Sequence, residues 1–142
     1  MLKIAVDFDG TIVTHEYPRI GKEIPFAIDS LKLLQQKYDV VLVLWSVRTG
    51  ERLNEAVEYC RQRGLEFYAA NKNYEEEELN ENISRKLDVD LFIDDRNLGG
   101  LPDWGIIYKM ISEKTYFDPI PQSGDFEYQG KEKKGFFAKL FG

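Results

Sequence analysis

The chain has 142 residues, a length that suits one domain with a core large enough to stand without disulfide bonds. Its net charge of −6 disfavours nucleic acid as the main partner, because phosphate backbones bind to basic surfaces. The single cysteine, Cys60, excludes an internal disulfide. It fits a reducing compartment, and no signal peptide or long apolar run is visible, so we expect a cytoplasmic protein.

Short apolar runs alternate with helical patterns along the chain. Strands are predicted over residues 3–8, 39–46, 65–71 and 89–94, with a further one at 104–110, and helices over 24–38, 49–64 and 75–87. Such alternation predicts an α/β fold of the three-layer, Rossmann-like kind, with a parallel sheet and helices on both faces.

The C-terminal stretch differs in composition from the rest. We expect a core over residues 1–118 and a linker and tail over 119–142. The last twelve residues, 131–142, combine four lysines with four large apolar side chains. They fit contact with a second subunit, which we favour, an anionic membrane surface or a groove on the same domain.

Pairs of carboxylates follow two of the predicted strands. Asp7 and Asp9 come at the end of the first strand, where residues two apart point the same way, and Gly10 permits a tight turn. Asp94 and Asp95 end the fourth predicted strand. If these strands are neighbours, the carboxylates converge and require a cation. Hard oxygen ligands without histidine or cysteine predict Mg²⁺, which in turn favours a phosphorylated ligand.

Other polar residues are placed to bind that phosphate. Ser46 ends the second predicted strand, so its hydroxyl and the neighbouring N–H of Val47 are candidates to hold a phosphoryl oxygen. Lys86 would add a positive charge beside the carboxylates. Arg48 is a candidate substrate contact or the partner in a salt bridge at a helix start. His15, in a short flap at about 11–23, is a weaker candidate, since a solvated loop explains it as well.

The order of these elements resembles the haloacid dehalogenase-like (HAD) superfamily. The resemblance rests on DFDGT after the first strand, a serine after the second, then a lysine and an acidic pair, and it covers about residues 1–108. It implies that Asp7 is a nucleophile forming an aspartyl-phosphate and that Asp9 is the general acid and base. Ser46 would bind the phosphoryl group and Lys86 would neutralise charge.

The same resemblance implies how Mg²⁺ is held. The ligands would be Asp7, the backbone carbonyl of Asp9, and Asp94, with Asp95 either a ligand or a residue that orients water. The connections are too short for an inserted cap domain, so the chain resembles the capless subclass. An open site of that kind accepts a small molecule or a macromolecular end, or is closed by another subunit.

The function expected from these residues is a Mg²⁺-dependent phosphatase acting on a phosphomonoester. The alternative is a phosphate-binding or phosphorylation-responsive regulatory module without turnover. Response-regulator receivers also carry an acidic pair, a serine or threonine and a lysine on a parallel sheet. They place the acidic pair first, whereas here DxD comes first and the pair late, and Asp9 has no counterpart in them.

Overall fold

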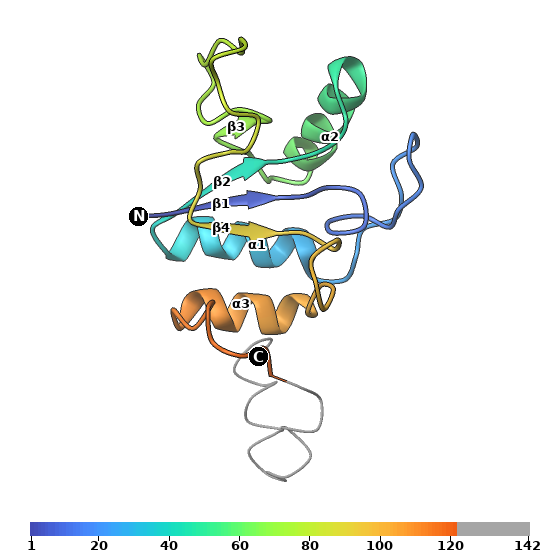
Figure 1. The fold of residues 1–142 in the computed structure, drawn as a ribbon. Helices are drawn as coiled ribbons and strands as arrows, with labels where there is room; N and C mark the ends of the chain where they lie inside the picture. Colours follow the sequence, from blue (N-terminus) through green and yellow to red (C-terminus); the bar gives the residue numbers. More distant parts are fainter. Residues whose placement is uncertain (122–142) are drawn as a thin grey trace, which may run out of the picture. The chain divides into compact units, whose positions relative to one another are not determined.

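The structure is a computed structural model that describes residues 1–121. The chain divides into two compact units, Met1–Leu101 and Pro102–Gly142. The first unit is built on four parallel strands: β1 Leu2–Val6, β2 Val40–Leu44, β3 Ala69–Ala70 and β4 Leu91–Ile93. Their order across the sheet is β3-β2-β1-β4, and β1, β2 and β4 point the same way in Figure 1.

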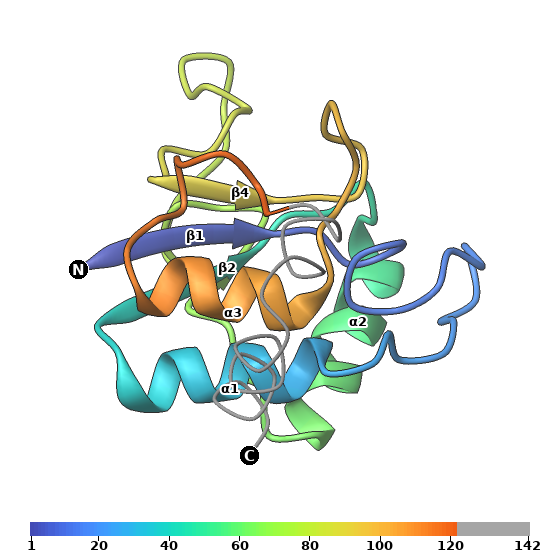
Figure 2. The ribbon, with the colours of Figure 1, turned by 90° about the horizontal axis from the view of Figure 1, so that it is seen from below.

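Two helices cover one face of this sheet. The helices are α1, Ala27–Lys37, and α2, Gly50–Gln62. Each connects a strand to its next neighbour in the same direction across the sheet, so right-handed crossovers put both on one side. Figure 2 shows both helices on the same side of the strands. Fully buried strand residues such as Ile4 and Leu42 and helix residues such as Leu31 and Leu34 form the core.

The other face of the sheet is covered by an irregular segment, residues 71–90. Leu87 packs there with Ala5, Val43 and Ala69, and Trp45, Val89 and Phe92 flank this cluster. The helix predicted over 75–87 is therefore wrong. Its apolar residues Leu79 and Ile83 are exposed, so no buried face supports the helix.

Hydrogen bonds hold this segment in its irregular course. Glu77 is buried and accepts hydrogen bonds from the backbone and side-chain nitrogens of Asn73, at 3.1 and 3.0 Å. The Asn73 side-chain oxygen accepts from the N–H of Asp88, at 2.7 Å. The segment closes on itself in this way without the i to i+4 bonds of a helix.

The second unit begins with α3, Trp104–Ser112. A further strand was predicted at 104–110, and this prediction is wrong. Asp103 caps the helix by accepting a hydrogen bond from the N–H of Ile106 at 3.0 Å. The buried residues recur at helical spacing: Trp104, Ile107, Met110 and Ile111.

The fold class is confirmed as α/β with a parallel sheet and, over residues 1–121, without an added cap domain. Helices on both faces of the sheet are not found in Met1–Leu101. None of the helices within residues 1–121 combines the length and apolar character needed to cross a membrane. The expected tail contact at 131–142 lies outside the described residues.

Candidate functional site

Three carboxylates meet at the carboxyl ends of β1 and β4. Oxygens of Asp7, Asp94 and Asp95 lie within 4.8 Å of one another, and all three residues are half-buried. The strands are adjacent, with Val6 paired to Ile93, so the residues that follow them must converge. This is the convergence predicted from the sequence, and the acidic cluster is able to hold a metal ion.

The turn after β1 shapes the cluster. The Thr11 hydroxyl lies 2.9 Å from Asp7 Oδ2 and 3.3 Å from Asp95 Oδ1, and it accepts the backbone N–H of Asp95 at 3.1 Å. Gly10 has φ +85°, and a Cβ there would lie 2.3 Å from Asp95 Oδ2. A side chain at position 10 would therefore displace Asp95 as well as strain the backbone.

Crowding changes the protonation of Asp7. Burial, a hydrogen bond with Asp95 and the negative charge of Asp94 raise the pKa of Asp7 from 3.8 to about 7, while the bond from Thr11 opposes the rise. Burial and neighbouring negative charge both disfavour the ionised form of a carboxyl, so Asp7 is ionised more readily when a positive charge lies beside it. A divalent ion bound to these oxygens would supply that charge, and the all-oxygen donor set suits Mg²⁺.

Asp9 is paired with a buried arginine. Arg48 Nε donates to Asp9 Oδ2 and a terminal nitrogen donates to Oδ1, both at 2.7 Å. The Arg48 side chain is 0% exposed and that of Asp9 5%. The hydrogen bonds with Asp9 raise the pKa of Arg48 above its ordinary value. Of the two roles considered for Arg48, the structure shows the salt bridge.

Arg48 also binds the loop at residues 11–23. Its guanidinium donates to the carbonyls of Pro18 and Arg19, at 3.2 and 3.1 Å. The guanidinium carbon lies 5.3 Å from the ring centre of Phe8 and 5.1 Å from that of Tyr17. The Arg48 side chain thus joins the segment before α2 to the acid that follows β1 and to the 11–23 loop.

The turn after β2 is positioned by a residue that follows β3. Asn71 Oδ1 accepts the N–H of Ser46 at 2.8 Å, and Asn71 Nδ2 donates to the carbonyl of Arg48 at 3.0 Å. The Ser46 hydroxyl oxygen accepts the N–H of Arg48 at 3.1 Å, which leaves its hydrogen free to donate elsewhere. Val47 is 74% exposed.

A pocket of about 290 Å³ joins these groups. Residues lining it include Asp7, Asp9, Asp94, Ser46, His15 and Arg96. His15 Nε2 lies 3.4 Å from a terminal nitrogen of Arg96. The structure therefore places His15 and Ser46, both predicted from the sequence, in one pocket with the carboxylates. Val47 and Trp45 line it as well.

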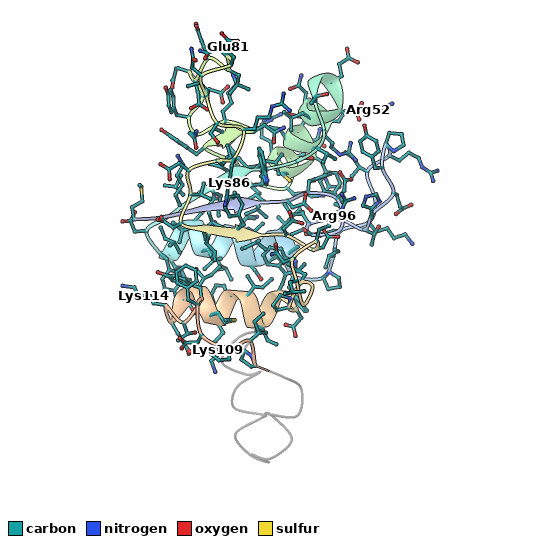
Figure 3. All side chains as sticks on the ribbon, viewed as in Figure 1. Arg52, Glu81, Lys86, Arg96, Lys109 and Lys114 are labelled. Atoms are coloured by element: carbon teal, nitrogen blue, oxygen red, sulfur yellow. The ribbon has the colours of Figure 1, made fainter. Side chains whose placement is uncertain are left out.

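Lys86 lies outside this pocket. Its Nζ stands 5.6 Å from the ring centre of Phe92, and Phe92 pairs with Ala5, two residues before Asp7. Lys86 is exposed, and no contact with the acidic cluster is found for it within residues 1–121. Figure 3 labels Lys86 and Arg96, and Arg96 lies nearer the carboxyl ends of the strands than Lys86 does.

Comparison with known proteins gives a relative among the solved structures. A scan against models of protein families and a search of curated proteins find no match. Among solved structures, the chain is similar to a conserved protein from Bacteroides thetaiotaomicron, with 67% identity and a TM-score of 0.77. The match covers 85% of this chain and 98% of the other. The chain belongs to the family of that conserved protein. This kinship supports the fold; the description of the relative assigns no activity to the family.

Sequence reasoning overlooked three residues of this family member's site. Thr11 was visible in DFDGT, but only its position beside two half-buried carboxylates reveals the hydrogen bonds. Asn71 is a polar residue directly after β3, a signal that follows the same rule as Ser46 after β2. Arg96 follows the acidic pair, and its place in the pocket depends on the turn that β4 enters.

Proposed function

We propose that the chain is a Mg²⁺-dependent phosphatase that hydrolyses a phosphomonoester through an aspartyl-phosphate on Asp7. The observation that carries the proposal is the acidic cluster of Asp7, Asp94 and Asp95, because Asp7 and Asp94 of this cluster line one pocket with Ser46. The resemblance of the sequence to the HAD superfamily and the geometry of the acidic cluster both support the proposal. A capless HAD-like chain requires these four residues to meet, although they follow three different strands.

Asp7 is the nucleophile in this proposal. A carboxylate oxygen attacks phosphorus, the bond from phosphorus to the leaving oxygen breaks, and water later releases phosphate from the aspartyl-phosphate. Thr11 orients the carboxylate through its bond to Oδ2. The Ser46 hydroxyl, whose hydrogen is free, is placed to donate to a phosphoryl oxygen.

The residues present fit a magnesium ion. Asp7 and Asp94 would hold it with the carbonyl of Asp9, and Asp95, bonded to Thr11, is either a ligand or an orienting neighbour. When bound, Mg²⁺ supplies positive charge that offsets the phosphoryl oxygens and lowers the pKa of Asp7. Ionised Asp7 is the nucleophilic form, so the ion and the nucleophile are linked.

Asp9 must leave its present partner to act as general acid. Both of its oxygens accept hydrogen bonds from Arg48, so it has no proton to donate in this arrangement. Transfer of a proton to the leaving oxygen requires the ion pair to open when substrate binds. The Arg48 contacts with Pro18 and Arg19 connect that opening to a movement of the 11–23 loop.

The Asp9–Arg48 pair also favours a second candidate function. If Asp9, the general acid and base, stayed paired with Arg48, the site would accept a phosphoryl group on Asp7 and release it slowly. The chain would then be a phosphorylation-responsive module. Treatment with acetyl phosphate separates the two functions, since the module retains an acid-labile phosphoryl group on Asp7 and the phosphatase does not.

Phosphate release tests the proposal. Wild-type protein, Asp7→Asn and Asp29→Asn would be assayed with p-nitrophenyl phosphate and a panel of phosphorylated metabolites, in Mg²⁺ and in EDTA. We expect wild-type turnover that EDTA abolishes and that Asp7→Asn lowers by about a thousandfold or more. Asp29 is exposed on α1, so Asp29→Asn is the matched control and retains activity. Turnover that survives in Asp7→Asn would overturn the mechanism.

A further inference from the structure

Arg96 lines the pocket that contains Asp7 and Ser46, unlike the arginines that form ion pairs with carboxylates. Arg48, Arg52 and Arg61 each form an ion pair with a carboxylate. Within residues 1–121, no carboxylate lies at ion-pair distance from the Arg96 guanidinium. Its contact is with His15, where the two nitrogens lie 3.4 Å apart. An exposed guanidinium without an anionic partner retains its donors for a ligand.

The pair bridges two segments that are remote in sequence. His15 belongs to the loop after β1, and Arg96 follows β4, 81 residues later. Both line the pocket that contains Asp7 and Ser46. Figure 3 shows Arg96 toward the carboxyl ends of the strands, where the acidic cluster lies.

The position of the Arg96 guanidinium is not explained by a role in neutralising the acidic cluster. The backbone N–H of Arg96 donates to Asp94 Oδ1 at 2.9 Å. The guanidinium turns instead toward His15, and no hydrogen bond joins it to Asp94 or Asp95 in the described part of the chain. A side chain placed only to balance these carboxylates would contact them directly.

The pocket consequently has two chemically different parts. Asp7 and Asp94 with a bound cation would take a phosphoryl group, while Arg96 and His15 offer N–H donors to an anion. Trp45 and Val47 contribute apolar surface, and the volume of about 290 Å³ suits a small ligand. A phosphate ester with a neutral or cationic far end would leave the Arg96 donors unused.

We propose that Arg96, with His15, binds a second anionic group on the substrate. The substrate class is then a small phosphomonoester that also carries a carboxylate or a second phosphate. This inference rests on the proposed phosphatase function and adds a residue that determines specificity. The chemistry that Arg96 recognises is shared by both anions, so the test includes an arm for each.

Matched substrates measure the preference for a second anion. The first pair is 4-carboxyphenyl phosphate and 4-carbamoylphenyl phosphate, which have similar shapes but differ by one negative charge. The second pair is 1,3-propanediol bisphosphate and propyl phosphate. In at least one pair, we expect kcat/KM to be higher by about tenfold or more for the member that carries the second anionic group. The difference should arise from a lower KM. The pair with the larger ratio identifies carboxylate or phosphate.

Variants assign the preference to Arg96. Arg96→Gln should reduce the ratio to near one, and Arg96→Lys should restore part of it because the positive charge returns. Arg61→Gln is the control, since Arg61 is an exposed arginine on α2 paired with Glu58. Its ratio should equal that of wild type.

Binding measurements separate failure of the inference from failure of the proposed function. Calorimetry in Mg²⁺ would compare phosphonoacetate with phosphonoacetamide, neither of which needs turnover. Phosphate release without a preference in either substrate pair, or a preference that survives in Arg96→Gln, overturns the inference alone. If no compound is hydrolysed, the proposed function fails. Tighter, Arg96-dependent binding of phosphonoacetate then supports the anion site, and equal affinities overturn it.

Discussion

Arg48 and Asp9 form the most deeply buried of the ion pairs in residues 1–121, and Asp9 is also the proposed general acid and base. From the sequence, Asp9 was expected as an acid and base facing the ligand. The structure shows its carboxylate engaged by two nitrogens of Arg48 instead. Each charge is acceptable inside the protein only because the other is there.

Removal of Arg48 should therefore destabilise the fold strongly. Arg48→Met retains an apolar stem beside Phe8 and Tyr17 but leaves Asp9 buried without a partner. We expect a loss of about 3–5 kcal/mol in the free energy of unfolding, measured by urea denaturation. Arg61→Met, which breaks an exposed pair with Glu58, should cost less than about 1 kcal/mol. Equal losses in the two variants would contradict the view that burial determines how much an ion pair contributes to the free energy of unfolding.

Gly10 offers a second test at the residue scale. Gly10→Ala puts a methyl group where Asp95 now lies, whereas Gly99→Ala meets nothing within 4 Å at a similar positive φ. Both substitutions strain the backbone by about 1–2 kcal/mol. Only Gly10→Ala should also weaken Mg²⁺ binding, by about tenfold or more, as measured by calorimetry. Unchanged Mg²⁺ affinity in Gly10→Ala would show that Asp95 is not needed for the metal.

At the scale of elements, the ends of β1, β2 and β3 are joined by side chains. Asn71 connects the end of β3 to the turn after β2, because its amide bonds both the N–H of Ser46 and the carbonyl of Arg48. Asn71 has φ +57°, a conformation that asparagine tolerates better than most residues. The position of Ser46, the proposed phosphate-binding residue, therefore depends on the residue that follows β3.

Asn71→Gly separates the hydrogen bonds of the Asn71 side chain from its positive φ. Glycine accepts the positive φ, so the variant loses only the two hydrogen bonds. We expect a decrease of about 1–2 kcal/mol in the free energy of unfolding and a higher KM for p-nitrophenyl phosphate, since Ser46 is no longer oriented. Thermal unfolding and steady-state kinetics measure the two effects. An unchanged KM would show that Ser46 is positioned without Asn71.

Elements also show why two of the sequence predictions failed. Residues 75–87 have helical spacing at Leu79, Ile83 and Leu87, but only Leu87 is buried. Residues 104–110 are apolar enough for a strand, yet Asp103 caps a helix there. Short apolar runs fit either element, and the choice depends on caps and on the surface available for packing.

At the scale of the whole molecule, the acidic cluster links stability to pH and, under the proposed function, to Mg²⁺. The pKa of Asp7 is raised from 3.8 to about 7 in the folded protein, so the folded state holds a proton that the unfolded state releases. The stability contributed by this proton is complete below about pH 4. It is lost as the pH rises through about 7.

We therefore expect the metal-free protein to become less stable between about pH 4 and pH 7. Thermal midpoints measured in EDTA should fall over this range, and Asp7→Asn should reduce the fall because its amide does not titrate. Mg²⁺ replaces the proton, so its stabilising effect should be larger at pH 8 than at pH 5. A stabilisation by Mg²⁺ that is equal at both pH values would indicate that the ion binds elsewhere.

That β1 and β4 are neighbours, so that Asp7, Asp94 and Asp95 converge, was decided by the tertiary structure. The sequence by itself determined the α/β class, most of β1, β2, α1 and α2, and the position of these carboxylates at the ends of two strands. These follow from local periodicity and from carboxylates directly after apolar strands, features that neighbouring residues carry. The tertiary structure alone decided the irregular course of 71–90, the pairing of Asp9 with Arg48, the link from Asn71 to Ser46 and the meeting of His15 with Arg96. Each depends on contacts between residues far apart in the chain, whose free energy no local pattern encodes.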